Sequence, residues 1–459
     1  MNKSNTINIM MKQLFFAGAL FCGLALNSYA QQVAPGDQVY NFTLADCISY
    51  AYQHQDSVLN AGLDAKGASY HVKEIIGQGL PQVNGSANFQ DYLQIPTTLI
   101  PGAFVGQPGT FIPLKFGVKY QSNIGVNATQ ILFDGNYIVG LQGRKTYQEL
   151  FNLNFNRSKI EANVNVTKSY YQVLVSSEQI KLLDANIREI KQTLDQTSAQ
   201  NKQGFVEKID VDRLSVQYNN LIAQRENTLR LLALNYQLLK FQMGMPIENN
   251  VVLKDKLEDV GLNSNVAELS ADSTFYHNRL EYSMLETQKK LDEYTVKSKI
   301  AQFLPKLTAN ASFANAYQNN AFSDLYSTSY PSSYIGLSLT VPIFTGFQHS
   351  NQLKQSKITV MKDENDLFNL KNGLSLQASQ ARTTYINGLQ SLNNQKQNQV
   401  LAQEILRVAK IKYQQGVGSS IEVTQAETDL QNADNNYIQG LYQALVSKVD
   451  LDKAYGRIK

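Results

Sequence analysis

The chain has 459 residues, with 41 Lys and Arg against 38 Asp and Glu, 25 Tyr, no Trp and two Cys. Two cysteines cannot form a disulfide framework or a four-cysteine metal site. The near balance of charge gives no reason to expect nucleic acid or an acidic substrate as a partner.

The first 30 residues have the features of an export signal. Lys3 and Lys12 precede an apolar run from Leu14 to Leu26, and Ser28-Tyr29-Ala30 has the small-x-small form of a signal-peptidase site. The apolar run is shorter than the roughly 20 residues that a membrane-spanning helix needs. We therefore expect an exported protein with a signal peptide at 1–30. Cys22 lies inside the run, and its lipidation stays an open but less favoured alternative.

The opening segment before the first proline anchor is expected to be one helix of about 36 residues, from Thr43 to Gln78. A helix of about 36 residues is also expected before the proline anchor of the second half of the chain. These anchors, Pro81 and Pro305, begin matching stretches 224 positions apart.

Alternation of polar and apolar residues follows each anchor, at about 82–132 and about 306–343. In the second case Leu307, Ala309 and Ala311 alternate with polar residues. This pattern predicts two β-hairpins with strands of about 10 to 14 residues. The alternation also fits a half-buried soluble sheet, but its length suits tilted strands that cross an outer membrane. The connection Asp91–Lys115, with four prolines, is expected to be a long irregular extracellular loop.

Each hairpin ends in a repeated motif: TQILFDG at Thr129–Gly135 returns as TVPIFTG at Thr340–Gly346. Proline-free segments follow at 136–203 and 347–415, each roughly 100 Å long if it forms one helix. Gly204 and Gly416 are expected to end these helices in the left-handed conformation. Returning helices are expected at 206–243 and 418–455.

The order of these motifs predicts two internal repeats. The first is expected at 31–244 and the second at 274–459, with a linker at 245–273. A chain with four membrane strands cannot close a barrel alone, and open sheet edges in lipid leave peptide groups unsatisfied at several kcal/mol each. The chain must therefore oligomerise. Two copies would give a filled eight-stranded barrel, and three would give twelve strands with a lumen.

The same order of features occurs twice in the chain: a hairpin after a proline, Phe-x-Gly, a long helix, a glycine turn and a returning helix. This doubled order resembles the TolC family of outer-membrane efflux channels over about Phe42–Arg457. The resemblance implies an α+β membrane protein. Its homotrimer would form a twelve-stranded barrel in outer-membrane lipid of a Gram-negative bacterium, continuous with a periplasmic coiled-coil barrel. The linker and the chain ends would form a small equatorial domain.

The same resemblance implies a passive exit duct of a tripartite efflux or type I secretion system. A periplasmic adaptor, or membrane fusion protein, would open it. An inner-membrane pump of the resistance-nodulation-division or ABC type would feed it. The transported substrate stays open, with drugs, metal ions and polypeptides all compatible. A non-channel periplasmic coiled-coil scaffold or adaptor protein is the alternative function.

The resemblance also implies a pore constriction after the second glycine turn. The first of two acidic family positions is matched by Glu422, whereas the second falls on the neutral Gln425. Three copies of Glu422 facing the axis would repel one another and attract cations, so that cation block is expected.

A family helix latch is matched by Tyr413 and Asp210, but its basic residue falls on Gly418. Arg213 is a candidate for the missing cation. The turns at Gly204, Gly416 and Gly418 would form the free periplasmic end, where adaptor docking is expected on exposed alanine and leucine positions. Without the resemblance, such residues would be read as solvated helix caps.

Enzymatic chemistry is not expected. The four histidines lack metal-ligand spacing: His54, His71, His277 and His349. No serine or cysteine lies in a nucleophile motif. We therefore expect neither a metal nor a cofactor.

Overall fold

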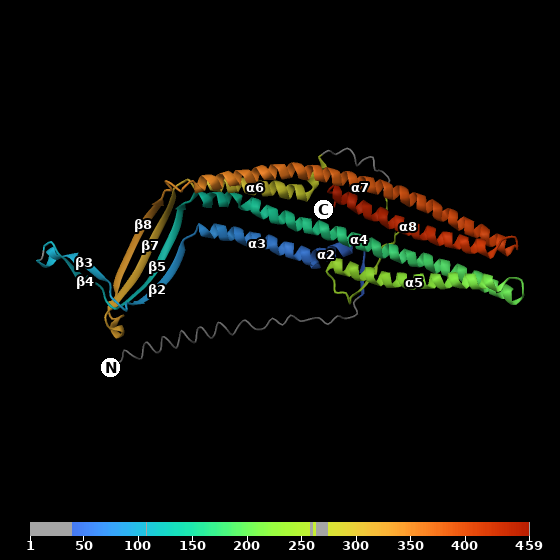
Figure 1. The fold of residues 1–459 in the computed structure, drawn as a ribbon, viewed down its shortest axis with the longest axis horizontal. Coiled ribbons are helices and arrows are strands. Elements are labelled where there is room, and N and C mark those ends of the chain that lie inside the picture. Colours follow the sequence, from blue (N-terminus) through green and yellow to red (C-terminus); the bar gives the residue numbers. More distant parts are fainter. Residues whose placement is uncertain (1–38, 107, 258–259, 263–273, 459) are drawn as a thin grey trace.

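The computed structural model describes residues 39–106, 108–257, 260–262 and 274–458. The predicted signal peptide, Cys22 and much of the predicted linker lie outside the described residues. The molecule is elongated, with a β-sheet at one end and a long helical body extending from it (Figure 1).

Four antiparallel strands form the main sheet in the order β2-β5-β7-β8. They are β2 (Gln82–Asp91), β5 (Tyr120–Phe133), β7 (Lys306–Asn319) and β8 (Tyr330–Thr340), with 10, 14, 14 and 11 residues. These lengths agree with the predicted 10 to 14. The central β5–β7 pair joins the two hairpins. Strands β2 and β8 are the free edges.

Strand register gives this sheet one apolar and one polar face. One cross-sheet row is Val83, Ala128, Ala311 and Ile335, and the next row, on the opposite face, is Asn84, Asn127, Ser312 and Tyr334. Successive residues of a strand point to opposite faces, so the sequence alternation becomes a difference between faces. Ile335 on the apolar face is 88% exposed. The apolar face thus has no cover within one chain.

The connection between β2 and β5 differs from the irregular loop that we predicted. It contains an antiparallel ribbon of β3 (Thr97–Pro101) and β4 (Phe111–Lys115), with Ile100 opposite Ile112. The apolar residues pair across the ribbon, while its prolines occupy positions that do not prevent the pairing. Proline content alone was therefore a misleading signal of irregular backbone.

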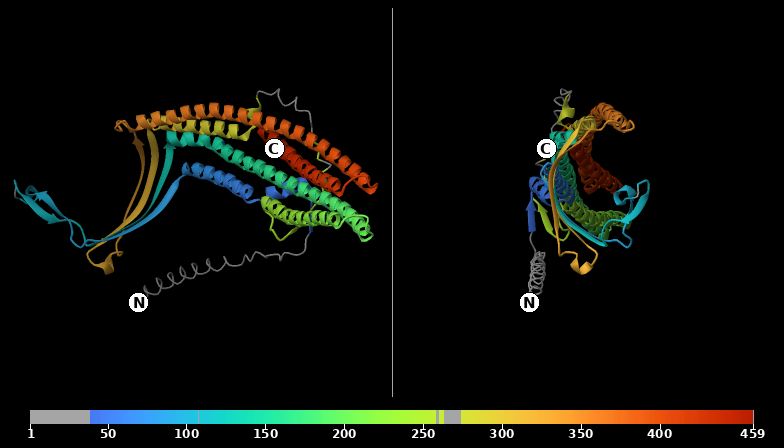
Figure 2. Two further views of the ribbon diagram at one scale, coloured as in Figure 1. Left: turned by 45° about the vertical axis from the view of Figure 1, so that its right-hand side comes forward. Right: turned by 90° about the vertical axis from the view of Figure 1, so that its left-hand side faces the viewer.

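Two long helices run from the sheet to the far end of the molecule (Figures 1 and 2). They are α4 (Gly135–Lys202) and α7 (Gln348–Gln414), and the returning helices are α5 (Lys208–Met243) and α8 (Ser420–Ala454). All four start and end within two residues of the predicted positions. Helix α5 packs on α4, and α8 packs on α7.

The helix predicted from Thr43 to Gln78 is wrong in one respect, because it is two helices. Helix α2 (Leu44–His54) and helix α3 (Asp56–Gln78) are separated by Gln55, whose backbone is extended with ψ of 127°. Its side-chain oxygen accepts a hydrogen bond from the Val58 amide, at 3.1 Å. Gln55 thus caps α3 at its start, where the continuous apolar pattern had hidden a break.

The corresponding helix in the second half is shorter than the predicted 36 residues or so. Helix α6 (Leu280–Ala301) has 22 residues and follows a short 3-10 turn, η4 (Phe275–Asn278). Arg279 stands between them and is almost fully buried. Its guanidinium donates to the Ala454 carbonyl of α8 at 3.0 Å and contacts the Glu281 carboxylate at 3.0 Å. This anchor fixes where α6 begins.

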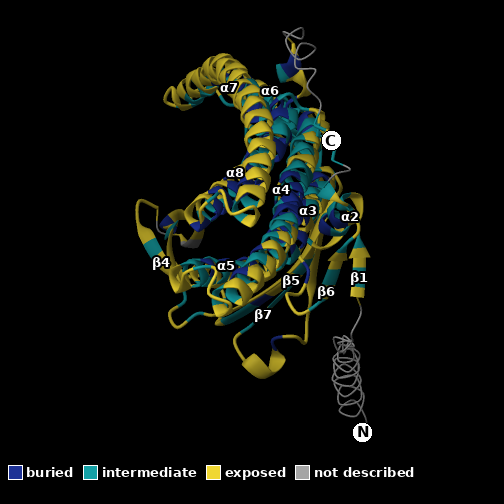
Figure 3. Cartoon of the chain, turned by 90° about the vertical axis from the view of Figure 1, so that its right-hand side faces the viewer, coloured by how far each residue is buried: buried dark blue, intermediate teal, exposed yellow. Residues whose placement is uncertain are grey.

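The main core lies midway along the helical body, where α2, α4, α5 and α8 meet. Beside it, β1 (Val39–Phe42) pairs in parallel with β6 (Asn250–Leu253). The Tyr170 hydroxyl donates to Asp255 at 2.8 Å, and burial raises the pKa of the Cys47 thiol to about 12. Buried residues follow the contacts between helices in Figure 3. None of the helices in the described ranges combines the length and apolar character needed to cross a bilayer.

Candidate functional site

The two helix turns at the far end of the molecule are alike. Gly204 ends α4 with φ of 78°, and Gly416 ends α7 with φ of 72°. In this left-handed conformation the following amides reach back to the helix: Phe205 donates to the Gln200 carbonyl, and Val417 donates to the Lys412 carbonyl, both at 3.0 Å. Glycine is favoured at both positions because it has no side chain to strain there.

Gly418 has a different reason to be glycine. A Cβ atom at this position would lie 2.9 Å from Lys412 Cβ and 3.0 Å from the Tyr413 amide nitrogen. The backbone of the turn therefore approaches α7 too closely for any side chain. This backbone therefore has no room for the basic residue that the resemblance implies at this position.

Large apolar side chains surround both turns and are open to solvent. Phe205 is 76% exposed and Val417 is 79% exposed, with Ile209 and Ile421 also exposed. We expected alanine and leucine positions here. The large exposed side chains are instead phenylalanine, valine and isoleucine, whereas Leu214 is buried because it packs between α4 and α5. Exposed apolar groups concentrated at a helix end favour a protein contact.

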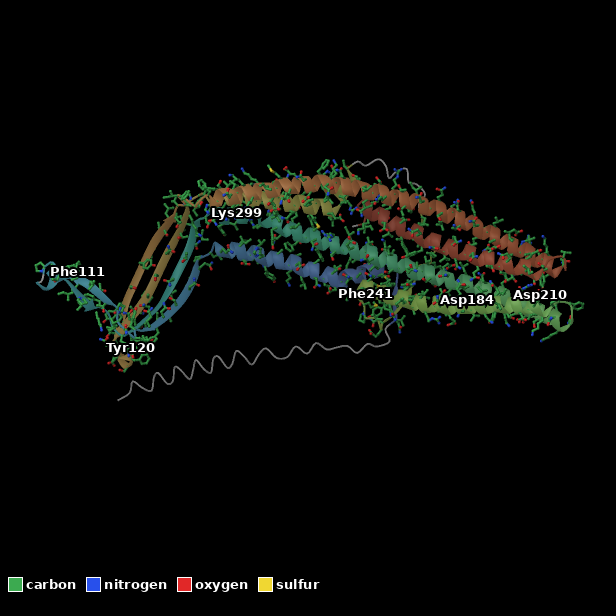
Figure 4. The ribbon with its side chains drawn as sticks, in the orientation of Figure 1. Phe111, Tyr120, Asp184, Asp210, Phe241 and Lys299 are labelled. Atoms are coloured by element: carbon green, nitrogen blue, oxygen red, sulfur yellow. The ribbon has the colours of Figure 1, made fainter. Side chains whose placement is uncertain are left out.

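Asp210 connects the two turns. It lies in the first turn of α5, near the far end of the molecule (Figure 4). Its carboxylate accepts a short hydrogen bond from the Ser420 hydroxyl at the start of α8, and Arg213 Nη1 lies 3.6 Å away. Ser420 was not among the predicted residues. The serine pair at the start of α8 carried a capping signal, but nothing in it indicated a partner on α5.

Tyr413 lies on α7, partly buried against the small apolar cluster that joins α7 and α8. Its hydroxyl is buried and has no hydrogen-bond partner among the described residues. Within one chain, then, the described contacts of Asp210 are with Ser420 and Arg213. No bond from Tyr413 to Asp210 is among the hydrogen bonds of the described chain.

The predicted constriction residues lie on one exposed face of α8. Ser419 caps this helix, and its hydroxyl accepts a hydrogen bond from the Glu422 amide at 3.3 Å. Gln425 follows one turn later and donates to Asp429 at 2.9 Å. All three side chains on this line, Glu422, Gln425 and Asp429, are exposed. Asp429 was missed by the sequence reasoning, although its spacing of seven from Glu422 places both carboxylates on the same face.

Three charged residues, each from a different helix, lie close together near the same end of the molecule. Lys410 on α7 has its Nζ 2.8 Å from Glu189 of α4 and 3.2 Å from Glu427 of α8. Glu427 is 8% exposed. Burial raises the pKa of its carboxyl, and the nearby Lys410 partly opposes this. Glu427 lies on the same seam as the buried Ala426 and Leu430, so a charged residue within an apolar seam was the signal that sequence reasoning missed.

A second buried acid continues these contacts along α8. Asp434 accepts hydrogen bonds from Asn186 of α4 and Gln399 of α7, both at 2.8 Å. Nearby, Gln179 and Gln224 approach Asn435 at 3.4 Å. Polar and charged groups therefore make many of the contacts by which α8 joins α4 and α5. In contrast, aliphatic residues form the seam between α7 and α8.

The described residues contain no group of three or more His, Cys, Asp or Glu side chains arranged to hold a metal ion. The predicted histidines lie apart from the helix turns. The candidate site therefore consists of the exposed apolar side chains at the two turns and the charged residues between the helices.

Comparisons with known proteins find similarity in sequence and fold over much of the chain. The family model for outer membrane efflux proteins matches residues 290–457. The chain is 23% identical to the outer membrane protein TolC of Escherichia coli, over 81% of this chain and 78% of that protein. It is 21% identical to the proteases secretion protein PrtF of Dickeya chrysanthemi, over 64% of each.

Among solved structures, the chain is similar to CusC, which is described as forming a transmembrane channel. The TM-score is 0.72 at 17% identity, covering 90% of this chain and 92% of that one. The family model, the relatives and the solved structures thus show a chain that is similar in sequence and fold to TolC-like outer membrane factors.

Proposed function

We propose that the protein is the outer-membrane exit duct of an efflux or type I secretion system. One observation carries this proposal: a four-stranded sheet with one apolar face and two free edges stands at the end of a long, polar helical body. In lipid, edges such as β2 and β8 must find partners. Ring closure with further copies supplies them, and three copies would give twelve strands around a lumen.

The chain is then a passive conduit made of two repeats, with an equatorial region where β1 and β6 meet the main core. Its apolar sheet face contacts lipid and its polar face lines the lumen. That polar face has Asn, Gln, Ser and Thr at most positions, and its main charge is Lys306 at the helical end of β7. Such a wall selects weakly by charge, so the attached pump determines the substrate.

The helix turns are the periplasmic gate in this proposal. Copies of Glu422 and Asp429 around the axis attract cations and repel one another. Ser420 and Asp210 hold the two turns of one chain together, with Arg213 as the adjacent cation. Tyr413, whose buried hydroxyl has no hydrogen-bond partner among the described residues, is proposed to form its latch bond only in the assembled ring.

An adaptor docks on the exposed apolar side chains beside Gly204, Gly416 and Gly418 and opens the gate. An inner-membrane pump of the resistance-nodulation-division or ABC type supplies the energy. Phe205 and Val417 are the central contacts. Covering them would remove unfavourable apolar exposure.

Two measurements test the function. Cell envelopes are fractionated, and the purified protein is sized in detergent; a stable oligomer in the outer-membrane fraction is expected. Planar-bilayer recording should then show channels that divalent cations block from the helical side. A monomeric protein in the soluble periplasmic fraction would reject the channel and favour the coiled-coil scaffold.

A further inference from the structure

The β3–β4 ribbon is an apolar surface with no cover in the single chain. The sequence from Tyr92 to Leu114 has no charged residue. Leu99 is 63% exposed, Phe104 is 81% exposed and Phe111 is 70% exposed. An isolated two-stranded ribbon is at best marginally stable in water, and exposed aromatic surface adds to the cost. The ribbon therefore needs a partner.

The base of the ribbon is a fixed bend. The β2–β5 ladder ends at Asp91 and Tyr120. Gly117 then turns the chain with φ of 125°, where a side chain would be strained. The Lys119 amide donates to Asn320 Oδ1 at 3.1 Å, so the connection between β7 and β8 holds the bend.

An aromatic cluster supports the same bend. The Phe322 ring packs edge-on against Phe89 and Tyr120, with ring centroids 5.8 and 5.6 Å apart. These rings come from three different segments of the chain. The direction of the ribbon is therefore set by tertiary contacts.

That direction is towards the hollow side of the sheet. Figure 1 shows the ribbon beyond the end of the sheet that is far from the helices. The end-on views of Figures 2 and 3, from opposite ends, place it on the side towards which the sheet and helices curve. This side becomes the interior if the ring closes, so the inference rests on the proposed function.

The position and chemistry of the ribbon favour other copies of itself as the partner. Outer-membrane lipid would contact the convex side of a closed barrel, and the ribbon lies on the other side. Pro101 and Pro113 lack amide donors, which disfavours extension of the ribbon by edge-to-edge strand pairing. Contact through side chains remains, and Leu99 and Phe111 share one face of the ribbon.

The dimensions fit such a contact. Twelve strands spaced about 4.8 Å apart and tilted about 40° enclose a barrel with a radius of about 12 Å. Five residues of an antiparallel strand span about 17 Å. A ribbon of that length, bent inward from the rim, reaches the axis.

We propose that the β3–β4 ribbons of the three copies meet over the outer mouth of the barrel and pack through Leu99, Phe104 and Phe111. They form an apolar lid that restricts access to the lumen from outside. This closure is separate from the periplasmic gate, and each ribbon lacks its partner surface in a single chain.

Cysteine crosslinking of the full-length oligomer tests the contact. Phe104→Cys should give covalent dimers with a short bis-maleimide, because the side chains meet near the axis. Ser323→Cys, exposed in the connection between β7 and β8, is the matched control and should give none. The buried Cys47 should not react in the parent protein.

The outcomes separate the two proposals. If the parent is not an oligomer in detergent, the proposed function fails, and the lid fails with it. If the oligomer is intact but Phe104→Cys crosslinks no more than Ser323→Cys, the lid alone is overturned. Crosslinks from Phe104→Cys to a different protein would overturn it as well.

A second measurement tests the restriction itself in whole cells. Asn123→Cys places a thiol on the polar face of β5, and a bulky polyethylene-glycol maleimide is added from outside. Adding Phe104→Ser and Phe111→Ser should remove the apolar packing of the lid, so that the bulky maleimide labels the thiol at least about tenfold faster. The rate of labelling by a small maleimide should change little. Equal bulky labelling with and without the two serines would contradict the lid.

Discussion

Replacing Lys410 by Met tests the buried ionic cluster near the helix turns. The substitution keeps the length of the side chain and removes its charge. Glu427, at 8% exposure, then loses the Nζ atom that lies 3.2 Å from its carboxylate. Glu189 also loses its contact at 2.8 Å, but its side chain is 48% exposed and water can replace the lysine.

At neutral pH, Lys410→Met should lower the free energy of unfolding by roughly 3–5 kcal/mol, the range for removing one partner of a buried ion pair. The cost depends on pH in a definite direction. Because the folded-state pKa of Glu427 is raised above its ordinary value of 4.5, the folded protein binds a proton more readily than the unfolded chain does. Stability therefore falls as pH rises from 4.5 through the raised pKa. In Lys410→Met this fall should be larger, because the lysine no longer opposes the shift.

Urea unfolding followed by helical circular dichroism, at pH 5 and pH 7.5, gives the measurement. Lys412→Met is the matched control, because Lys412 is exposed on the same helix two residues away. Adding Glu427→Leu to Lys410→Met should recover most of the loss, since no buried charge is then unpaired. If Lys410→Met behaves like Lys412→Met at both pH values, the cluster does not carry the assigned charges.

Three further results are expected. Gly418→Ala should destabilise the turn by about 1–3 kcal/mol through overpacking. Gly67→Ala, in open space on α3, should instead stabilise the protein by about 0.5–1 kcal/mol. Equal melting temperatures of the two variants would contradict the close approach at Gly418. Ser420→Ala should remove a hydrogen bond to the Asp210 carboxylate, worth about 1.5–3 kcal/mol. Amide exchange at the start of α8 should then become faster, whereas Thr424→Ala should leave it unchanged. Unchanged exchange in Ser420→Ala would show that Ser420 does not connect the two turns. Glu422→Ala should raise the half-blocking concentration of a divalent cation roughly tenfold in planar bilayers, equivalent to about 1.4 kcal/mol, and unchanged block and conductance would show that the constriction is elsewhere.

Much of the fold follows from local patterns in the sequence. Alternation in β7, from Lys306 to Asn319, is a property of neighbouring residues and already determines which side chains share a face. The absence of proline between Asn136 and Gln203 permits a helix of 68 residues, and Gly204 supplies the conformation that ends it. Such signals extend over a few residues and do not need knowledge of the rest of the chain.

The errors have a common cause. The break at Gln55 interrupts an apolar pattern that continues on both sides, because α2 turns towards the core beside β1 while α3 packs along α4. The β3–β4 ribbon was expected to be irregular from its prolines. Its strand pairing depends on register between Thr97 and Lys115, which composition does not reveal.

The sequence by itself determined the two faces of the sheet and the lengths of the two long helices and the two returning helices, since each follows from periodicity along the chain. Only the tertiary structure decided that Ser420 binds Asp210, 210 residues away, that Glu427 is buried against Lys410, and that the outer ribbon bends towards the hollow of the sheet. These features depend on which helices and strands lie side by side, and packing brings together residues whose types alone give no sign of their partners.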